Sequence, residues 1–365
     1  MNSRFTWAAY HSSESPGAAK TPLPRATMLA RFPFDWHNLM FQQETIPLPD
    51  EPGPNPKKES QNEQTSFAGS HQLDTTSSRP PPAWGRADRN RLLIWGGIAF
   101  VLPVPFVLAL HPSLSRSVSV FTVQSELPTK ALTAFFALMA TWVVSRMEKR
   151  PLDDYGAPPR QAFGKRFWEG TLWGFAMLSA LLLVLRVSGH FQIDSVALTG
   201  RAVFRYALGW AATFLAVAIT EEFGYRGYLL FIVSRRRSFW PAALFLSVAF
   251  GAAHLANHGE NALGILQVVA IGLVFCLTIR RTGSLWFAVG FHAAWDWAET
   301  FFYGTPNSGL SGLGRFLNTS VKGPDWLTGG SAGPEGSVIA LVVLLLCGLI
   351  VHLRFPKAIY PDRPL

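Results

Sequence analysis

Apolar residues dominate the chain from residue 92 onward and fall into long runs that short polar segments separate. A membrane-spanning helix needs about 20 predominantly apolar residues, and most of the runs reach or approach that length. A single such run is compatible with a buried helix of a soluble protein, but a succession of them is not. The pattern predicts an all-α membrane protein with about eight transmembrane helices. The predicted spans are residues 92–110, 131–144, 168–187, 206–233, 239–256, 262–279, 284–302 and 337–353.

The first 90 residues have a different character, being rich in Pro, Ser, Gln, Asn and charge. Such a segment cannot bury enough apolar surface to offset its ordering entropy. We therefore predict a disordered cytosolic tail over residues 1–90, a transmembrane domain over 91–355, and a short cytosolic tail over 356–365.

The distribution of charge supports this topology and argues against a nucleic-acid partner. The net charge is +9, but hydrophobic residues make up 49% of the chain and charged residues only 15%. If the N-terminus is cytosolic and the chain crosses eight times, nearly all basic residues next to the spans fall in cytoplasmic segments, as expected for membrane proteins. The basic excess therefore indicates orientation, with both termini cytoplasmic, and predicts no nucleic-acid partner. We expect the membrane to be a bacterial cytoplasmic membrane. The two cysteines, Cys276 and Cys347, lie in apolar runs and predict neither a disulfide framework nor a cysteine-based zinc site.

The segment AITEEFGYRGYLL (218–230) places three charged residues inside an apolar run. Charged residues within a membrane are costly and usually face the bundle interior or a wet cavity. Glu222 and Arg226 are four residues apart, so they share a helix face and can form an ion pair. Glu221 points about 100° away and has no partner in its own helix. This leaves Glu221 as a candidate general base, while a purely structural charge cluster is the alternative.

Two later runs carry further polar residues. His254 lies in the apolar part of one run, whereas His258 falls beyond it and is expected at the surface. His292 and Asp296 are four residues apart and share a face, which also fits a simple His–Asp hydrogen bond. At a rise of about 1.5 Å per residue, Glu221, His254, His292 and Asp296 all lie ~12–24 Å from the cytoplasmic ends of their helices. This common depth predicts one buried site.

Three motifs in this order resemble those of the CPBP family, the CAAX proteases and bacteriocin-processing enzymes. EEFGYRG (221–227) resembles the family's EExxxR motif, FGAAH (250–254) its FxxxH motif, and HAAWD (292–296) its HxxxN/D motif. The likeness covers residues 90–355 and implies the membrane fold of a type II CAAX prenyl protease. It also implies an intramembrane endopeptidase acting on a membrane protein or lipidated peptide within the bilayer.

The resemblance also implies roles for single residues. Glu221 and His254 would activate water, and His292 and Asp296 would form the oxyanion pocket. Glu222 and Arg226 match positions with a structural or substrate-orienting role. Ionised aspartate cannot donate a hydrogen bond to an oxyanion, so we expect Asp296 to orient His292 instead, as an acid fixes an imidazole in a catalytic triad.

Three alternatives stay open from the sequence. Glu221, His254, His292 and Asp296 could together ligate zinc, but no HExxH motif is present and we favour a glutamate mechanism without a cofactor. A membrane immunity or binding module could keep the fold without turnover. A proton or ion transporter also uses membrane carboxylates, but the chain lacks the internal repeat common in transporters.

Overall fold

The computed structural model describes residues 85–110, 120–257 and 259–364, all within one compact unit. Most of the predicted N-terminal tail and His258 lie outside these residues. Helix α2 (Arg86–Gly96) begins before the predicted domain boundary at residue 91. The prediction assigned the charged residues of the first turn of α2 to the tail, and the domain boundary itself stays a prediction. One of them, Asp88, forms an ion pair with Arg236 at the end of another helix.

Each predicted span corresponds to a helix, so the predicted all-α membrane fold is confirmed. Five helical segments in the described part of the chain are long and apolar enough to cross a membrane, and α8 and α12 are shorter apolar helices. The helices are α2, continued by η2 (Gly97–Val101) and α3 (Val104–Leu110), α4 (Val123–Glu148), α5 (Lys165–Val187), α6 (Arg201–Glu222), η5 (Phe223–Gly227), α7 (Tyr228–Arg237), α8 (Phe239–His254), α9 (Ala262–Thr282), α10 (Trp286–Trp297), η6 (Ala298–Tyr303) and α12 (Val338–Arg354).

The segments predicted to be cytoplasmic gather at one end of the helices. Arg91 of α2 donates to Glu148 at the end of α4, at 3.4 Å. The C-terminal segment returns to the same end, where Tyr360 donates its hydroxyl to the Asp154 carbonyl at 3.0 Å and its N–H to the Arg280 carbonyl at 3.1 Å. Short helices η3 (Leu152–Tyr155) and η4 (Pro159–Gln161) also follow α4 here.

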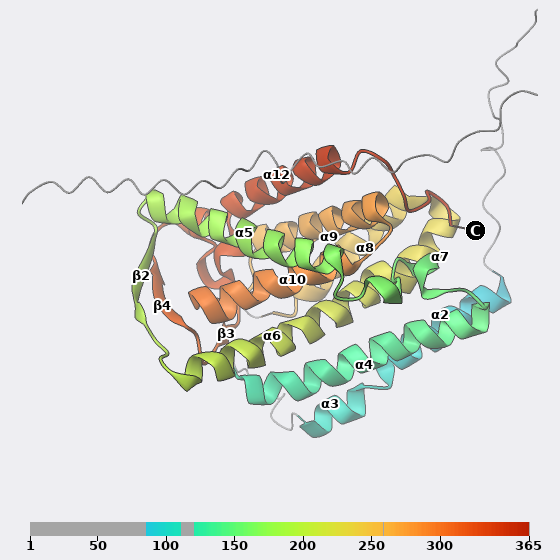
Figure 1. Ribbon diagram of the computed structural model, residues 1–365, viewed down its shortest axis with the longest axis horizontal. Coiled ribbons are helices and arrows are strands. Elements are labelled where there is room, and N and C mark those ends of the chain that lie inside the picture. The colour runs from blue at the N-terminus through green and yellow to red at the C-terminus, as the bar shows by residue number, and fades with distance from the viewer. Residues whose placement is uncertain (1–84, 111–119, 258, 365) are drawn as a thin grey trace, which may run out of the picture. The chain divides into compact units, whose positions relative to one another are not determined.

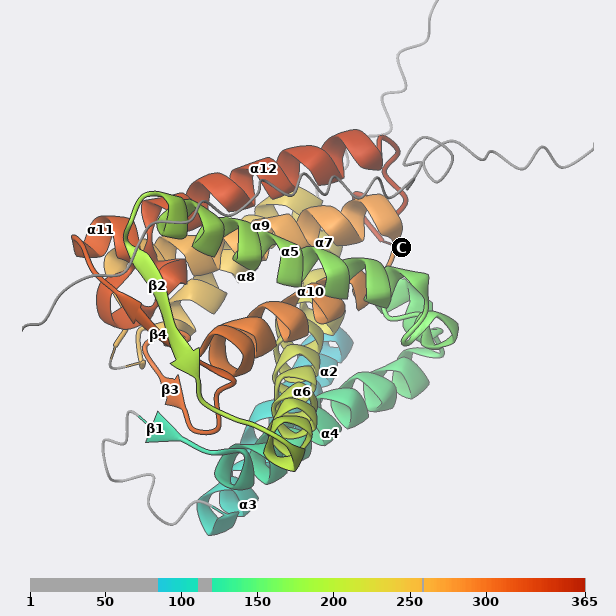
Figure 2. The same cartoon turned by 60° about the vertical axis from the view of Figure 1, so that its left-hand side comes forward.

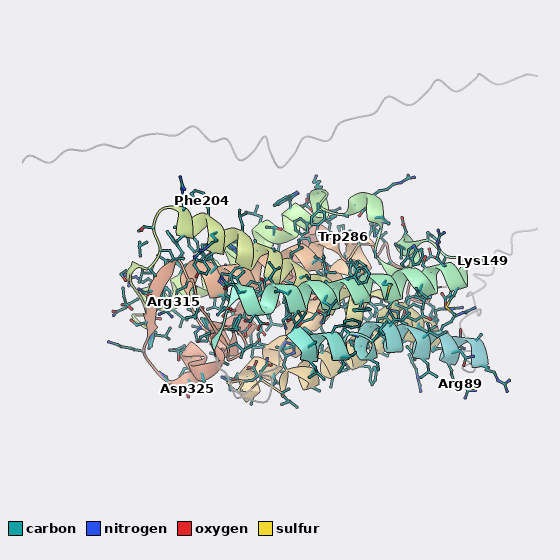
Figure 3. All side chains as sticks on the ribbon, turned by 90° about the horizontal axis from the view of Figure 1, so that it is seen from below. Arg89, Lys149, Phe204, Trp286, Arg315 and Asp325 are labelled. Atoms are coloured by element: carbon teal, nitrogen blue, oxygen red, sulfur yellow. The ribbon has the colours of Figure 1, made fainter. Side chains whose placement is uncertain are left out.

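The connections at the opposite end carry the small strands. β2 (Phe191–Val196) pairs antiparallel with β4 (Leu317–Val321), and β1 (Val120–Phe121) pairs parallel with β3 (Ser311–Gly312). The last connection adds α11 (Asp325–Thr328), η7 (Gly330–Ala332) and η8 (Pro334–Gly336). Figure 3 shows Arg89 and Lys149 at one end and Phe204, Arg315 and Asp325 at the other. The chain therefore alternates between two ends as predicted, and the assignment of the basic end to the cytoplasm stays a prediction.

Helix α10 runs through the interior of the bundle, where α5, α6 and α9 pack against it (Figures 1 and 2). Its approach to α5 depends on glycine. A Cβ atom added to Gly170 or Gly174 of α5 would overlap the backbone of Phe287 or Phe291 in α10, and one added to Gly290 would overlap that of Phe167. Small residues allow such close backbone contact in membrane helices. This packing holds α10 rigidly and so positions His292 and Asp296.

Candidate active site

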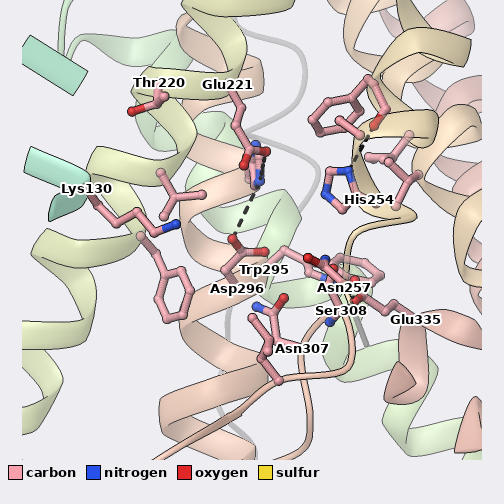
Figure 4. A pocket seen from close by; sticks show the side chains of 18 of the residues that line it. Lys130, Thr220, Glu221, His254, Asn257, Trp295, Asp296, Asn307, Ser308 and Glu335 are labelled. Carbon is pink, nitrogen blue, oxygen red and sulfur yellow. Dashed lines mark hydrogen bonds and ion pairs between the residues drawn. The ribbon is translucent and has the colours of Figure 1, made fainter. Parts of the chain in front are cut away.

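A cavity of about 430 Å³ opens between α4, α6, α8, α9 and α10. Glu221, His254, His292 and Asp296 all line it, although they come from three separate helices. Figure 4 shows Glu221, His254 and Asp296 directed towards a common space. The structure thus brings together the four residues that sequence spacing placed at one depth. It leaves their catalytic roles as predictions.

Glu222 and Arg226 do not line this cavity. Their side chains are 0% and 1% exposed, and Arg226 Nη1 donates to Glu222 Oε1 at 2.9 Å. The pairing predicted from their spacing is therefore present. The pair sits at a π-helical turn, η5, which interrupts the long helix between α6 and α7. Such turns occur frequently at functional sites.

Aromatic rings enclose the buried guanidinium. The Arg226 Cζ atom lies 4.3 Å from the centre of the Phe250 ring and 5.6 Å from that of Phe275. Arginine stacks on aromatic faces more readily than lysine because its guanidinium is planar and weakly hydrated. Arg226 of η5 therefore contacts α8 and α9 through two rings that line the cavity, although Arg226 itself does not line it.

The imidazole of His292 contacts carboxylates on both of its edges. Nδ1 donates to Glu222 Oε1 at 3.0 Å. Nε2 faces Asp296 Oδ2 at 3.5 Å and Glu221 Oε2 at 3.6 Å, both longer than a normal hydrogen bond. Glu222 thus makes the shortest contact with His292, while Asp296 lies at the opposite edge of the ring, as its i,i+4 spacing predicted. The closer contact comes from α6 and was not predicted, and the role of Asp296 in orienting His292 stays a prediction.

His254 is held in one tautomer by its own helix. Nδ1 lies 2.9 Å from the Phe250 carbonyl oxygen, which can only accept, so Nδ1 carries the proton. In the neutral ring Nε2 therefore has a lone pair, and this nitrogen faces the cavity (Figure 4). The Phe250 ring packs edge-on against the imidazole, with the ring centres 4.7 Å apart.

Glu221 differs from Glu222 in accessibility. Its side chain is 28% exposed and lies 3.6 Å from His292 Nε2, whereas the Glu222 side chain is fully buried. Glu221 and Glu222 are adjacent in α6 but point in different directions. The Glu221 carboxylate faces the cavity, whereas the Glu222 carboxylate is buried outside it and paired with Arg226. This is the arrangement expected of an active-site base beside a structural acid.

Further polar residues, which were not predicted from the sequence, lie at the outer end of the cavity. Asn257, Asn307, Ser308 and Glu335 line it there, and all four come from connections between helices. Glu335 is 5% exposed although it lies in a connection, within the short helix η8. Its isolated position in the glycine-rich segment GGSAGPEG (329–336) was the one available signal, since such a loop can turn a side chain inward.

The arrangement of the acids and imidazoles in the cavity bears on the zinc alternative. Across residues 85–110, 120–257 and 259–364, no group of three or more His, Cys, Asp or Glu side chains is arranged to hold a metal ion. His292 directs one nitrogen away from Glu221 and Asp296 and towards Glu222. The choice between a zinc site and a glutamate mechanism stays a prediction.

Comparison with known proteins supports the motif-based resemblance. Residues 203–298 match the family described as type II CAAX prenyl endopeptidase Rce1-like. A protein of Bacillus subtilis (strain 168), described as the uncharacterized protein YyaK, is 25% identical over 247 residues, which are 64% of this chain and 81% of that protein. No solved structure matches the chain. The predicted resemblance is confirmed, and the family supports an intramembrane protease kind of function in an integral membrane protein.

Proposed function

We propose that this chain, an intramembrane protease by its family resemblance, hydrolyses a peptide bond in a membrane-associated protein or peptide with water activated by Glu221 and His254. The observation that carries the proposal is that Glu221 and His254 line the same cavity and that each offers a hydrogen-bond acceptor there. Glu221 presents an accessible carboxylate, and His254 presents a nitrogen lone pair fixed by the Phe250 carbonyl. Both groups are acceptors, which suits them to bind the two hydrogens of one water molecule.

The chemistry follows from these acceptors. A water that donates one hydrogen to Glu221 and one to His254 directs an oxygen lone pair at a substrate carbonyl. Glu221 takes a proton as the water oxygen attacks the carbonyl carbon, and a tetrahedral oxyanion forms. When the C–N bond breaks, Glu221 returns this proton to the leaving amine. The peptide bond is thereby replaced by a carboxylic acid and an amine, with one water consumed.

His292 is suited to support this cycle. Its Nδ1–H is held by Glu222, so a second proton on Nε2 would face Asp296 and Glu221 and satisfy both carboxylates. An imidazole protonated in this way could stabilise negative charge as it develops on the substrate. Asp296 would then balance the charge of His292 without acting as an oxyanion donor itself.

The substitution Glu221→Gln tests the proposal. Glutamine keeps the size of the side chain but cannot accept a proton, so we expect a loss of cleavage of roughly 10²–10⁴-fold. The assay is cleavage of a mixture of N-acetylated synthetic peptides by the purified protein, with sites read by mass spectrometry. An unchanged melting temperature serves as the folding control, because Glu221 is partly exposed.

Two results would count against this mechanism. A Glu221→Gln protein that retains more than about a tenth of the activity would lose only about 1.4 kcal/mol of barrier, too little for a general base. Loss of wild-type activity on chelation, followed by recovery with zinc, would make Glu221 and His254 metal ligands. No cleavage by the wild-type protein would favour an immunity or binding module.

A further inference from the structure

Glu335 lies at the outer end of the cavity and is held there by an unusual loop. Its Oε1 accepts hydrogen bonds from both the backbone N–H and the hydroxyl of Ser308, the latter at 2.8 Å. Ser308 has a φ of 45°, a left-handed conformation that is uncommon outside glycine. Ser308 therefore has an unfavourable backbone conformation, and in this conformation its N–H and its hydroxyl both bond the same carboxylate oxygen.

Two glycines that precede Glu335 in the chain also determine the conformation of its loop. Gly333, two residues before it, has a φ of 104°, and a Cβ there would overlap the Pro306 carbonyl. Gly329 has a φ of 87°, and a Cβ there would overlap the Gly333 carbonyl. Only glycine fits at these two positions. The loop is thus built to turn Glu335 into the cavity.

The second carboxylate oxygen of Glu335 has no partner among the residues that the structure describes. Oε2 makes no hydrogen bond to a described residue, and it is not among the unpartnered atoms that are sealed from solvent. No Lys or Arg in the described part of the chain pairs with Glu335. The residue is nevertheless 95% buried, as its 5% exposed fraction shows. A carboxyl group that is this buried and lines a cavity is placed to bind a polar or charged group there.

The surrounding charges favour a cation as the group that binds there. Burial and the nearby carboxylates of Glu260 and Asp296 raise the pKa of Glu335 to about 8. Lys130, a basic residue that also lines the cavity, forms its ion pair with Glu126 at 3.9 Å and not with Glu335. Without a cation beside it, this carboxyl therefore keeps its proton near neutral pH. A positively charged group beside Glu335 would favour release of the proton to solvent and would pair with the carboxylate in a poorly solvated site, where such interactions are strong.

We infer that Glu335 forms a subsite for a basic side chain, Lys or Arg, of a substrate residue close to the bond that is cleaved. The inference rests on the proposed function, because the same cavity contains Glu221 and His254. A cavity of about 430 Å³ holds only a few side chains beside the reacting peptide. The group that reaches Glu335 therefore belongs to a residue near the scissile bond.

The first experiment profiles cleavage of N-acetylated peptides, which have no free α-amine, by wild-type protein and by Glu335→Gln. Glutamine retains an acceptor for Ser308, so the loop should keep its conformation. We expect wild type to select Lys or Arg at one fixed position, and the substitution to reduce this selection at least tenfold, equivalent to about 1.4 kcal/mol.

Glu299→Gln is the matched control. Glu299 is another buried acid close to Glu335, at 0% exposed, but it does not line the cavity. Its substitution should leave the selection unchanged. Cleavage by wild type without basic selection, or selection that persists in Glu335→Gln, would overturn the inference while leaving the proposed function intact.

A binding measurement separates the subsite from turnover. The inactive Glu221→Gln protein is melted with millimolar N-acetyl-arginine amide or N-acetyl-norleucine amide. We expect stabilisation by the arginine compound alone, and its loss when Glu335→Gln is added. Equal effects of the two compounds, or no effect of either, would contradict the subsite. If wild type cleaves no peptide but the arginine compound binds through Glu335, the proposed function fails and the subsite stands.

Discussion

Removal of either partner of the Glu222–Arg226 ion pair should destabilise the protein strongly. Both side chains are essentially inaccessible to solvent, so water cannot replace the lost partner. Breaking a buried ion pair costs about 3–5 kcal/mol. Arg226→Ala also loses the contacts of the guanidinium with Phe250 and Phe275, and a desolvated cation–π contact contributes about 2 kcal/mol. Total stabilities of domains are typically about 5–15 kcal/mol, so Arg226→Ala should lower the folded yield severely.

The double substitution Glu222→Gln with Arg226→Met removes both charges together. Replacing a whole buried ion pair by groups of similar size is often nearly neutral, because no uncompensated charge remains. The glutamine that Glu222→Gln introduces would still offer an acceptor to Nδ1 of His292, which now bonds Glu222 Oε1. We expect the double variant to be more stable than the sum of the two single losses predicts, by about 2 kcal/mol.

Folded yield from fluorescence-detected size exclusion and the melting temperature in one detergent measure these effects. Asp154→Asn is the matched control. Asp154 forms an i,i+4 ion pair with Arg150 at 3.0 Å, but their side chains are 35% and 31% exposed. Exposed pairs contribute about 0–1 kcal/mol, so this variant should melt close to wild type. If Arg226→Ala reaches full yield and melts normally but is inactive, Arg226 belongs to the chemistry and the structural reasoning is refuted.

Three further predictions concern topology, packing and pH. Reporters fused at Ser311 and at the C-terminus should report opposite sides of the membrane, and a common side would overturn the topology. Gly174→Val should cost about 1–3 kcal/mol through overlap with α10, whereas Gly96→Ala, with nothing within 4 Å of the added atom, should be tolerated. Glu335 binds its proton more tightly when folded than when unfolded, because its pKa is about 8 instead of 4.5. Stability from this group should therefore fall as pH rises from about 4.5 to 8, by an amount on the order of 2 kcal/mol between pH 6 and 9. Melting at several pH values should show a smaller fall for Glu335→Gln.

Local spacing accounts for what the sequence predicted well. A span is recognised from its length of apolar residues, and the Glu222–Arg226 pair from an i,i+4 spacing within one helix. The common depth of the site residues required only the rise per residue and the positions of the helix ends. Each of these quantities is a property of one segment, so a single sequence contains it.

The features that were missed depend on contacts between segments far apart in the chain. Glu222 and His292 are 70 residues apart, and Ser308 and Glu335 are 27 apart. Only the packing of α6 against α10 shows that Glu222 holds the imidazole. The antiparallel pairing of β2 with β4 is equally non-local, because its strands belong to different connections. No periodicity within either strand predicts which partner it will find.

One oxygen atom joins the fold to the site. Glu222 Oε1 accepts from Arg226 at 2.9 Å and from His292 at 3.0 Å, so the ion pair and the orientation of the imidazole share an acceptor. Loss of Arg226 would leave Glu222 free to rotate and would release His292 as well. An activity assay alone would then assign Arg226 to catalysis although it never reaches the cavity. Only a stability measurement on the same protein distinguishes a residue that reacts from one that holds a reacting residue in place.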